Sequence, residues 1–508
     1  MARASRLKSL LQPPVHLRRL AAMVAQLIRI KVRSRVHRQT CPMATPIIPP
    51  DFDPALVARY DVAGPRYTSY PTAPQFDASF DEAALRQVIR ASNEEPIPRP
   101  LSLYVHVPFC MSPCFYCGCN RVITRDIGQA DRYLERLYRE IELVAPLFDR
   151  DRPVRQLHFG GGTPNFLDVS RMRELMESLA RHFSFSRLTE REYGIELDPR
   201  FADGDYVRAL AELGFNRLSV GIQDFDPAVQ EAVNRIQSFE QTQEAIVAAR
   251  GSGFRSVSVD LIYGLPKQNL DGFSRTLDQV VALQPDRVAV YGYAHLPEMF
   301  KAQRQIVAEE LPDAGTRLAL FGRALAQLSA AGYVYIGMDH FARADDELAL
   351  AQRAGTLQRN FQGYSTHGDC DIVGLGVSAI SRIGDSYSQS ARDLTGYYAT
   401  LDAGRLPVAR GLLLDEDDVI RRELIGELMC HGRVDKRRFG ERHRLLFDEY
   451  FAAARERLQP LIADGLLLED DASLQVTSPG RLLLRIIAMC FDAYLDGQSH
   501  TPRYSRAI

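Results

Sequence analysis

The chain has 508 residues, which is long enough for two or more domains and a substantial core. Charged residues make up 25% of it and hydrophobic residues 46%, the usual balance of a globular protein. The net charge of −2 conceals an asymmetry, because residues 1–50 hold ten of the 62 Lys and Arg and none of the 64 Asp and Glu. The remainder therefore carries a net charge of −12, which argues against a nucleic-acid-binding surface.

The basic segment at residues 1–42 allows three interpretations. Its arginines and its lack of acids are also features of an organellar transit peptide. Its apolar stretch, residues 20–30, is interrupted by Gln26 and Arg29 and is too short to span a bilayer, so no membrane span is expected. We favour the third interpretation, a disordered tail or a mis-assigned start, because Met43 begins a sensible start of its own and no motif precedes it.

Six apolar runs of strand length follow residue 100, and amphipathic segments of helical period separate most of them. The predicted strands are residues 101–107, 156–159, 193–197, 217–222, 257–263 and 287–293; helices are predicted at 131–147, 171–182 and 239–249. Alternating β and α units favour parallel strands with helices packed outside them. The predicted fold class is α/β, with a partial (β/α)6 TIM-like barrel.

The β/α alternation stops after about residue 381. Residues 415–465 have a mainly helical pattern, and a strand–turn–strand–helix pattern follows, with the last helix predicted at 480–495. This arrangement resembles a winged helix, but it has no basic face, so packing or covering of a substrate is favoured over DNA binding. We expect four parts: a basic extension (1–42), an N-terminal element covering the site (43–95), a catalytic barrel (96–390) and a C-terminal helical domain (391–508).

Four cysteines lie within ten residues, directly after the strand predicted at 101–107. Cys110, Cys114 and Cys117 form C-x3-C-x2-C, and Cys119 follows. Three thiolates on one short loop can hold three irons of a cubane iron–sulfur cluster and leave the fourth iron open for chemistry. The end of a parallel strand is also where such a fold carries its active site.

Two other interpretations of the cysteines are possible. A structural zinc site usually takes two C-x2-C pairs that are a dozen or more residues apart, unlike this run. A disulfide framework is disfavoured because the other cysteines, Cys41, Cys370, Cys430 and Cys490, are scattered. Such scattering suits a reducing compartment, and the protein is expected in the cytoplasm.

The cysteine motif is the signature of radical S-adenosylmethionine (SAM) enzymes. Together with Cys119 and GPRYTSYPTA at residues 64–73, it resembles the oxygen-independent coproporphyrinogen III oxidase family. Further motifs agree, among them HFGGGTP (158–164), FNRLSVGIQDF (215–225), VNRIQ (233–237), DLIYGLPKQ (260–268), YAHLP (293–297) and GLGVSAIS (374–381). The resemblance extends from about residue 55 to the C-terminus.

The resemblance implies a 4Fe-4S cluster and two SAM molecules. It assigns the cluster to Cys110, Cys114 and Cys117, the first SAM to Tyr104, Gly161, Glu196 and Ile380, and the second SAM to Tyr116, Gly162, Thr163, Gln223, Arg235, Asp260 and Ala294. Cys119 is expected near the substrate or the second SAM, not as a cluster ligand. Residues 64–73 are expected to be a flexible element that reaches over the site and closes it against solvent.

The residue types support some of these roles on their own. Asp260 lies inside an apolar predicted strand, where an unpaired carboxylate is costly to bury, so it should bind a ligand or pair with a cation. Arg235 offers a bidentate fork to a carboxylate. Glu196 could instead be a salt-bridged residue at the edge of the core, and Tyr104 and Tyr116 could be ordinary barrel aromatics. We assign no histidine to a metal.

The implied reaction is oxidative decarboxylation of coproporphyrinogen III to protoporphyrinogen IX, driven by a 5′-deoxyadenosyl radical. Three alternatives stay open: a haem chaperone with the same barrel, a radical methyltransferase of tetrapyrroles and a structural zinc protein. The presence of Cys119 and of residues 64–73 disfavours the chaperone. The expected partners are coproporphyrinogen III and an electron donor such as flavodoxin or ferredoxin, with no nucleic acid, and the chain is expected to be a monomer.

Overall fold

A computed structural model describes residues 50–495 and Arg506. The chain divides into two units, Met1–Ile48 and Pro49–Ile508, and everything below concerns the second. The basic extension predicted at residues 1–42 lies outside the described residues. No described helix combines the length and the apolar character that a membrane span needs.

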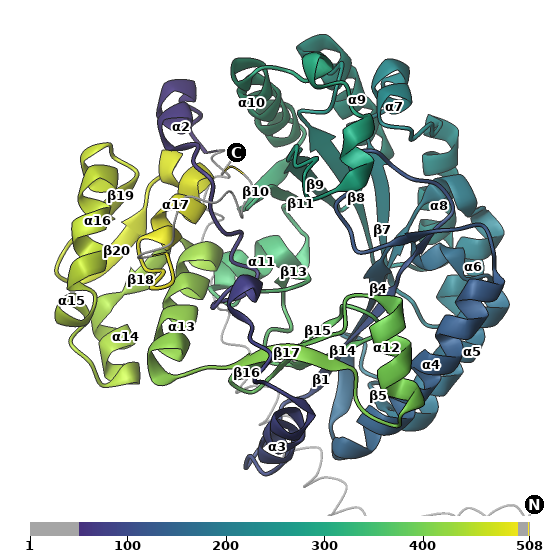
Figure 1. Ribbon diagram of the computed structural model, residues 1–508. Helices are drawn as coiled ribbons and strands as arrows, with labels where there is room; N and C mark the ends of the chain where they lie inside the picture. The colour runs from purple at the N-terminus through teal and green to yellow at the C-terminus, as the bar shows by residue number, and fades with distance from the viewer. Residues whose placement is uncertain (1–49, 496–505, 507–508) are drawn as a thin grey trace, which may run out of the picture. The chain divides into compact units, whose positions relative to one another are not determined.

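A thirteen-stranded sheet forms the centre of this unit (Figure 1). Six of its strands are parallel neighbours that follow one another in chain order: β1 (Leu101–Val107), β4 (Pro153–Gly161), β6 (Glu192–Leu197), β7 (Arg217–Gln223), β8 (Ser256–Tyr263) and β9 (Arg287–Gly292). The six predicted strands are therefore confirmed, with ends that differ by up to three residues. Their parallel pairing confirms the partial (β/α)6 barrel.

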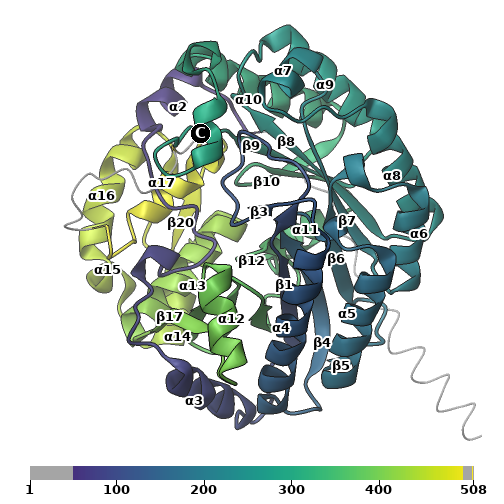
Figure 2. The ribbon, with the colours of Figure 1, turned by 45° about the vertical axis from the view of Figure 1, so that its right-hand side comes forward.

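Helices cover the outer side of these parallel strands (Figures 1 and 2). They are α4 (Gly128–Val144), α5 (Val169–His182), α6 (Gly204–Glu212), α8 (Phe239–Gly251), α9 (Leu270–Leu283) and α10 (Ala314–Ala330). In α4, Leu134, Leu137 and Ile141 lie on one helical face and are buried. Polar side chains start several of the helices; Asp168 caps α5, and Ser238 forms a capping box with Gln241 at the start of α8.

The sheet extends beyond the barrel strands in a way that the sequence did not predict. β14 (Asp371–Leu375) pairs in parallel with β1, and β15 (Ile380–Ile383), β16 (Ser386–Ser390) and β17 (Val408–Leu413) then add antiparallel strands. At the other edge, β11 (His340–Arg343) and β10 (Tyr333–Gly337) are antiparallel additions to β9. The β/α alternation does stop near residue 381, but the same sheet continues to Leu413.

The C-terminal region has a second hydrophobic core of its own. It contains α13 (Glu416–His431), α14 (Lys436–His443), α16 (Ala452–Ala463) and a small sheet of β18 (Arg433–Asp435), β20 (Ser473–Val476) and β19 (Leu467–Glu469). The predicted strand–turn–strand is confirmed. The helix predicted at 480–495 is shorter in the structure: a 3-10 turn occupies Pro479–Leu483, and α17 spans Leu484–Met489. Beyond α17, Asp492 accepts hydrogen bonds from Tyr494 N and Tyr67 Oη.

The segment at residues 64–73 is packed against this second core. Tyr67 donates to buried Asp492 at 2.9 Å, and Tyr70 Oη accepts from Ala493 N at 3.1 Å. The buried guanidinium of Arg485 donates to the carbonyl of Pro65 at 2.9 Å. Tyr67 and Tyr70 therefore anchor the segment to the second core.

Candidate active site

A cavity of about 300 Å³ opens at the carboxyl ends of the parallel strands. Its lining combines side chains of the cysteine loop with residues from β4, β6, β7 and β8. A second cavity of about 200 Å³ lies inside the barrel and shares Glu196, Ser219, Asp260 and Tyr291 with the first. The site is therefore placed where parallel-stranded enzymes gather their reacting groups.

The cysteine loop is held in place by backbone hydrogen bonds on several sides. It begins in β2 (Phe109–Cys110), which pairs with β3 (Val122–Ile123). Arg121 donates to the carbonyls of Cys117 and Cys114 at 3.0 and 3.1 Å. Phe115 N donates to the carbonyl of Val233 at 2.9 Å, which joins the loop to the end of helix α7 (Pro227–Ala232). These contacts fix the backbone of the loop that carries the thiols.

All four thiols of the loop line the cavity, and every described cysteine is free of disulfides. Cys110 and Cys114 are buried, whereas Cys117 is half-buried and Cys119 is exposed. Thr163 Oγ1 donates to Cys110 Sγ at 3.3 Å. Burial raises the pKa of the Cys110 thiol to about 11, so a bound metal is the natural partner that would hold it as a thiolate.

The glycine turn after β4 packs against the cysteine loop so closely that side chains are excluded. Gly161 has φ +119°, and a Cβ there would lie 2.7 Å from the ring of His106. A Cβ on Gly162 would lie 2.7 Å from the backbone of Pro108. Gly162 N donates to Val107 O, and Thr163 N donates to Phe109 O, both at 2.8 Å. The turn therefore supports the loop that carries the thiols.

Two arginines and one carboxylate surround the Cys114 thiol. Arg235 Nη1 lies 3.0 Å from Asp198 Oδ2 and 3.6 Å from Cys114 Sγ. Arg200 Nη2 lies 2.7 Å from the same carboxylate oxygen and 3.5 Å from the same sulfur. Although burial opposes it, Arg235 and Arg200 lower the pKa of Asp198. The excess positive charge favours a thiolate or an anionic cluster beside these guanidiniums.

Tyr104, His158 and Glu196 form a row of contacts that runs from β1 to the cavity. Tyr104 stacks on His158 with ring centroids 6.1 Å apart, and His158 Nε2 lies 3.3 Å from Glu196 Oε1. Glu196 lines both cavities. A Cβ on Gly160 would meet this carboxylate at 2.8 Å, so the first glycine of the turn makes room for Glu196.

Gln223 ends β7, and Asp260 lies within the neighbouring strand β8. Ser219 donates to Asp260 at 3.2 Å, and burial together with nearby Glu196 raises the pKa of Asp260 to about 7. Asp260 forms no ion pair with any residue that the structure describes, so of its two predicted roles ligand binding is the one left open. Gln223 has φ +68°, a left-handed conformation that is uncommon outside glycine and often marks a functional position.

Most of the predicted site residues meet at this cavity. The lining includes Cys110, Cys114, Tyr116, Cys117, Gly161, Gly162, Thr163, Glu196, Gln223, Arg235 and Asp260. Tyr104, Ala294 and Ile380 are outside the lining; Tyr104 reaches Glu196 through His158, the carbonyl of Ala294 accepts from Gln303 at 3.1 Å, and Ile380 packs near Tyr387. Their predicted contacts with SAM stay predictions.

Several lining residues were missed by sequence reasoning, notably Asp198, Arg200, Ser219 and Tyr291. Asp198 and Arg200 directly follow β6, so their position after a strand was the available signal. Asp198 pairs with Arg235, which lies 37 residues further along, and the sequence alone does not reveal this pairing.

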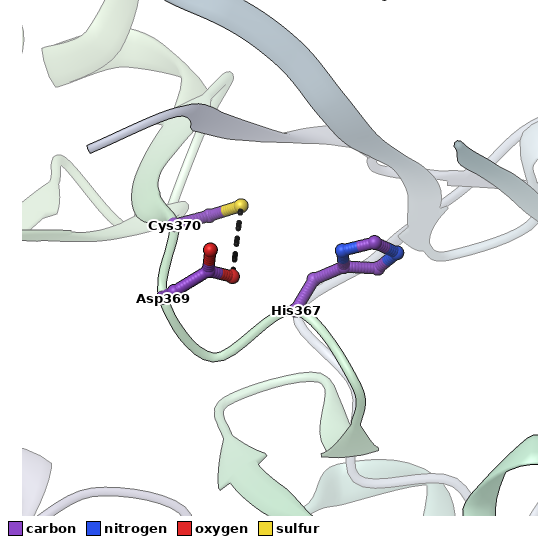
Figure 3. A group of neighbouring side chains, drawn as sticks. All are labelled: His367, Asp369 and Cys370. Atoms are coloured by element: carbon purple, nitrogen blue, oxygen red, sulfur yellow. Dashed lines mark hydrogen bonds between the residues drawn. The ribbon is translucent and has the colours of Figure 1, made fainter. Parts of the chain in front are cut away.

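A second group of possible metal ligands lies in the turn before β14. One ligand atom each of His367, Asp369 and Cys370 lies within 4.8 Å of the others (Figure 3). Asp369 Oδ2 is 3.5 Å from Arg155 Nη1, and His367 Nε2 is 3.2 Å from the carbonyl of Glu190. Burial raises the pKa of the Cys370 thiol to about 12. Because Arg155 already balances the carboxylate, we assign this group no metal.

Comparison with known families defines the class of the protein. The radical SAM superfamily matches residues 104–280, the span that carries the cysteine loop and most of the cavity, and the HemN C-terminal domain matches residues 414–483. The protein is a radical SAM enzyme.

Full-length relatives then give the family. The oxygen-independent coproporphyrinogen III oxidase of Pseudomonas aeruginosa is 52% identical over 461 residues, 90% of this chain and 99% of the relative. Its Escherichia coli counterpart is 48% identical over 458 residues, with the same two coverages. The solved structure of coproporphyrinogen III oxidase from Escherichia coli, described as a radical SAM enzyme, matches with a TM-score of 0.83 at 47% identity and covers 88% of this chain and 100% of its own. The chain belongs to the oxygen-independent coproporphyrinogen III oxidase family.

A radical SAM enzyme uses a 4Fe-4S cluster and SAM, and the residues at the cavity fit both groups. Three thiols of one loop face a shared space beside cationic Arg235 and Arg200, which suits an anionic cluster. Polar groups of Glu196, Gln223 and Asp260 face the same space and suit a charged, polar cofactor.

Proposed function

We propose that the protein converts coproporphyrinogen III to protoporphyrinogen IX by oxygen-independent oxidative decarboxylation, a step of haem biosynthesis. Two propionate side chains become vinyl groups. Each loses one hydrogen atom from its β-carbon, its carboxylate as CO₂ and one electron. The observation that carries this proposal is the cavity itself: three loop thiols, two arginines and three polar groups on the barrel strands, in a chain 52% identical to a relative with this name over almost its whole length.

The residues of the cavity are proposed to divide the work. Cys110, Cys114 and Cys117 hold three irons, and Cys119 stays free near the substrate. When bound, the cluster and SAM supply the 5′-deoxyadenosyl radical that takes the hydrogen atom. Arg235 and Arg200 balance the negative charge next to Cys114, and the glycine turn keeps the loop in position.

A second SAM molecule is part of this proposal. The polar residues fall into two groups, one around Glu196 with Tyr104 and His158, and one around Gln223, Arg235 and Asp260. The two cavities share four lining residues, which supports placing a second cofactor molecule beside the first. Tyr116, Gly162, Thr163 and Ala294 are proposed at the second SAM, and Gly161 and Ile380 at the first.

The electron donor, the compartment, the oligomeric state and the domain division are also part of the proposal. A flavodoxin or ferredoxin would deliver the low-potential electron. The free cysteines suit a cytoplasmic, reducing environment. One chain lines the whole cavity, so the protein is proposed to act as a monomer. The division at residues 42, 95 and 390 is kept as a proposal, with β17 of the last part joined to the barrel sheet.

Anaerobic product analysis tests the proposal. The reconstituted protein, with SAM, dithionite and coproporphyrinogen III, should yield protoporphyrinogen IX, and Cys114→Ser should yield none. Cys370→Ala is the matched control, since it removes a buried thiol outside the cavity and should retain activity. Production of S-adenosylhomocysteine, or haem binding without decarboxylation, would contradict the proposal.

A further inference from the structure

A small cavity of about 50 Å³ lies away from the site described above. Four parts of the chain enclose it: residues 67–70, the hairpin of β12 (Gln358–Asn360) and β13 (Gly363–Ser365), strands β15 and β16, and α13. Its lining contains three arginines, Arg359, Arg382 and Arg422, and no Asp or Glu. We refer to it as the arginine pocket.

The arginine pocket contains buried N–H groups that have no hydrogen-bond partner among residues 50–495 and Arg506. They are Arg359 Nε and Nη1, Arg382 Nε, Arg422 Nη1 and Asn360 Nδ2. Asn360 is only 3% exposed. All of these atoms are donors, and no acceptor atom of the lining residues is left unpaired in the same way. Unpaired buried polar groups are rare because each is costly, so a shared set of them calls for an acceptor.

The other nitrogens of the arginines hold the guanidiniums in fixed positions. Arg422 Nη2 pairs with Asp385 at 2.6 Å, and Arg382 Nη2 donates to the carbonyl of Gly368 at 3.0 Å. Arg359 lies over the ring of Tyr364 at 4.7 Å. The unpaired donors are therefore preorganised rather than free to turn toward water.

The charges of the arginine pocket are also unbalanced. Asp385 is the one carboxylate that pairs with any of its three arginines in the described part of the chain. Burial and the neighbouring guanidinium of Arg422 lower the pKa of Arg382. Water could satisfy the donors but would leave the excess positive charge in place, whereas an anion satisfies both.

We propose that the arginine pocket binds a carboxylate. Planar guanidinium forks match the two oxygens of this group. A water-sized atom needs roughly 10–15 Å³ of such space, so the cavity of about 50 Å³ holds roughly three to five atoms and has room for a carboxylate group. The carboxylate would join residues 67–70 to the hairpin and to α13. It is either a free monocarboxylate or, resting on the proposed function, a propionate arm of the tetrapyrrole.

Acetate is the probe for the first experiment, on the full-length reconstituted protein. The unfolding midpoint is followed against acetate concentration, with ionic strength held constant by a bulky sulfonate. The wild-type midpoint should rise and saturate. In Arg382→Gln the half-saturating acetate concentration should rise by about tenfold or more. Arg437→Gln, a substitution of an arginine that is 85% exposed on α14, is the control and should behave like wild type.

Asn360→Asp is a second variant that does not depend on Arg382→Gln folding. Asn360 Oδ1 accepts from Gln362 N at 2.9 Å, and aspartate keeps this contact while placing a carboxylate among the guanidiniums. The variant should unfold at a higher temperature than wild type and lose its response to acetate. A lower midpoint with an unchanged acetate response, or a wild-type response that never saturates, would overturn the proposal.

Competition identifies the source of the carboxylate. If it is a propionate arm, acetate should weaken the binding of oxidised coproporphyrin III, and Asn360→Asp should weaken it too. If it is a free monocarboxylate, coproporphyrin III and acetate should bind independently. Both results require the acetate site. Product formation is measured separately, so failure of the arginine pocket would leave the proposed decarboxylation untouched.

Discussion

At the scale of single residues, the glycine turn and the cysteine loop depend on each other. The family resemblance assigned Gly161 to the first SAM and Gly162 to the second. The structure adds a nearer reason, since Gly161 and Gly162 make room for His106 and Pro108, which lie beside the thiols. A glycine-rich turn is readable from sequence, but the atoms that it accommodates are not.

Gly162→Ala should therefore disturb the cysteine loop. Its Cβ would meet the backbone of Pro108 and Phe109, which cannot swing aside as a side chain could. We expect a loss of about 1–3 kcal/mol in the free energy of unfolding and reduced incorporation of iron. Iron and sulfide per chain after anaerobic reconstitution measure this. Gly251→Ala, where a Cβ meets nothing within 4 Å, is the control, and equal iron contents in the two variants would refute the steric argument.

Arg235→Met should destabilise the protein, because it removes one of the two cationic partners of the buried Asp198 carboxylate. Buried Asp198 would keep Arg200 as its partner but lose Arg235, so we expect a cost of about 1–3 kcal/mol in the free energy of unfolding. Denaturant titration measures the cost. Arg275→Met removes an exposed arginine 3.6 Å from Asp226 and should cost less than about 0.5 kcal/mol. Equal losses of unfolding free energy in the two variants would show that the buried ion pair stabilises the protein no more than the exposed one.

At the scale of elements, α4 joins the barrel to later parts of the chain through one buried acid. Glu140 is 1% exposed, and its Oε2 accepts from Gly376 N at 2.7 Å and from Tyr397 Oη, in α12 (Leu394–Asp402), at 2.6 Å. Helical period predicted α4, but Glu140 reads as a surface residue in the sequence. Its partners lie more than 230 residues further along, so no local pattern could identify them.

Glu140→Gln should change the pH dependence of stability. Burial raises the pKa of Glu140 to about 7, above its ordinary value of 4.5. The folded state therefore binds more protons between those values, and wild-type stability should fall as pH rises through this window, by about 3 kcal/mol at most. The amide oxygen of glutamine preserves both contacts, so the variant should lose this fall. Denaturant unfolding between pH 4.5 and 8 measures the free energy of unfolding of both proteins. Glu142→Gln, on the exposed side of α4, is the control and should behave like wild type. If the free energies of Glu140→Gln and wild type change in parallel with pH, the prediction is wrong.

At the scale of the whole described chain, local patterns predicted the barrel and not its extension. The parallel strands are apolar runs, and helices of clear period separate them, so their order was readable. β16, with the sequence SYSQS, is buried throughout although three of its five residues are serines, and so it lacked the apolar signal of a strand. The arginine pocket likewise draws donors from several separate elements, and only the folded chain shows that they meet.

The central claim is a cluster held by three thiolates, with one iron left for SAM, and Mössbauer spectroscopy of the anaerobically reconstituted protein tests it most directly. We predict a 4Fe-4S spectrum in which one iron site changes when SAM is added. Cys119→Ser should show the same change, whereas Cys117→Ser should not assemble a normal cluster. Bound zinc in place of the cluster, or four iron sites that are all insensitive to SAM, would contradict the account.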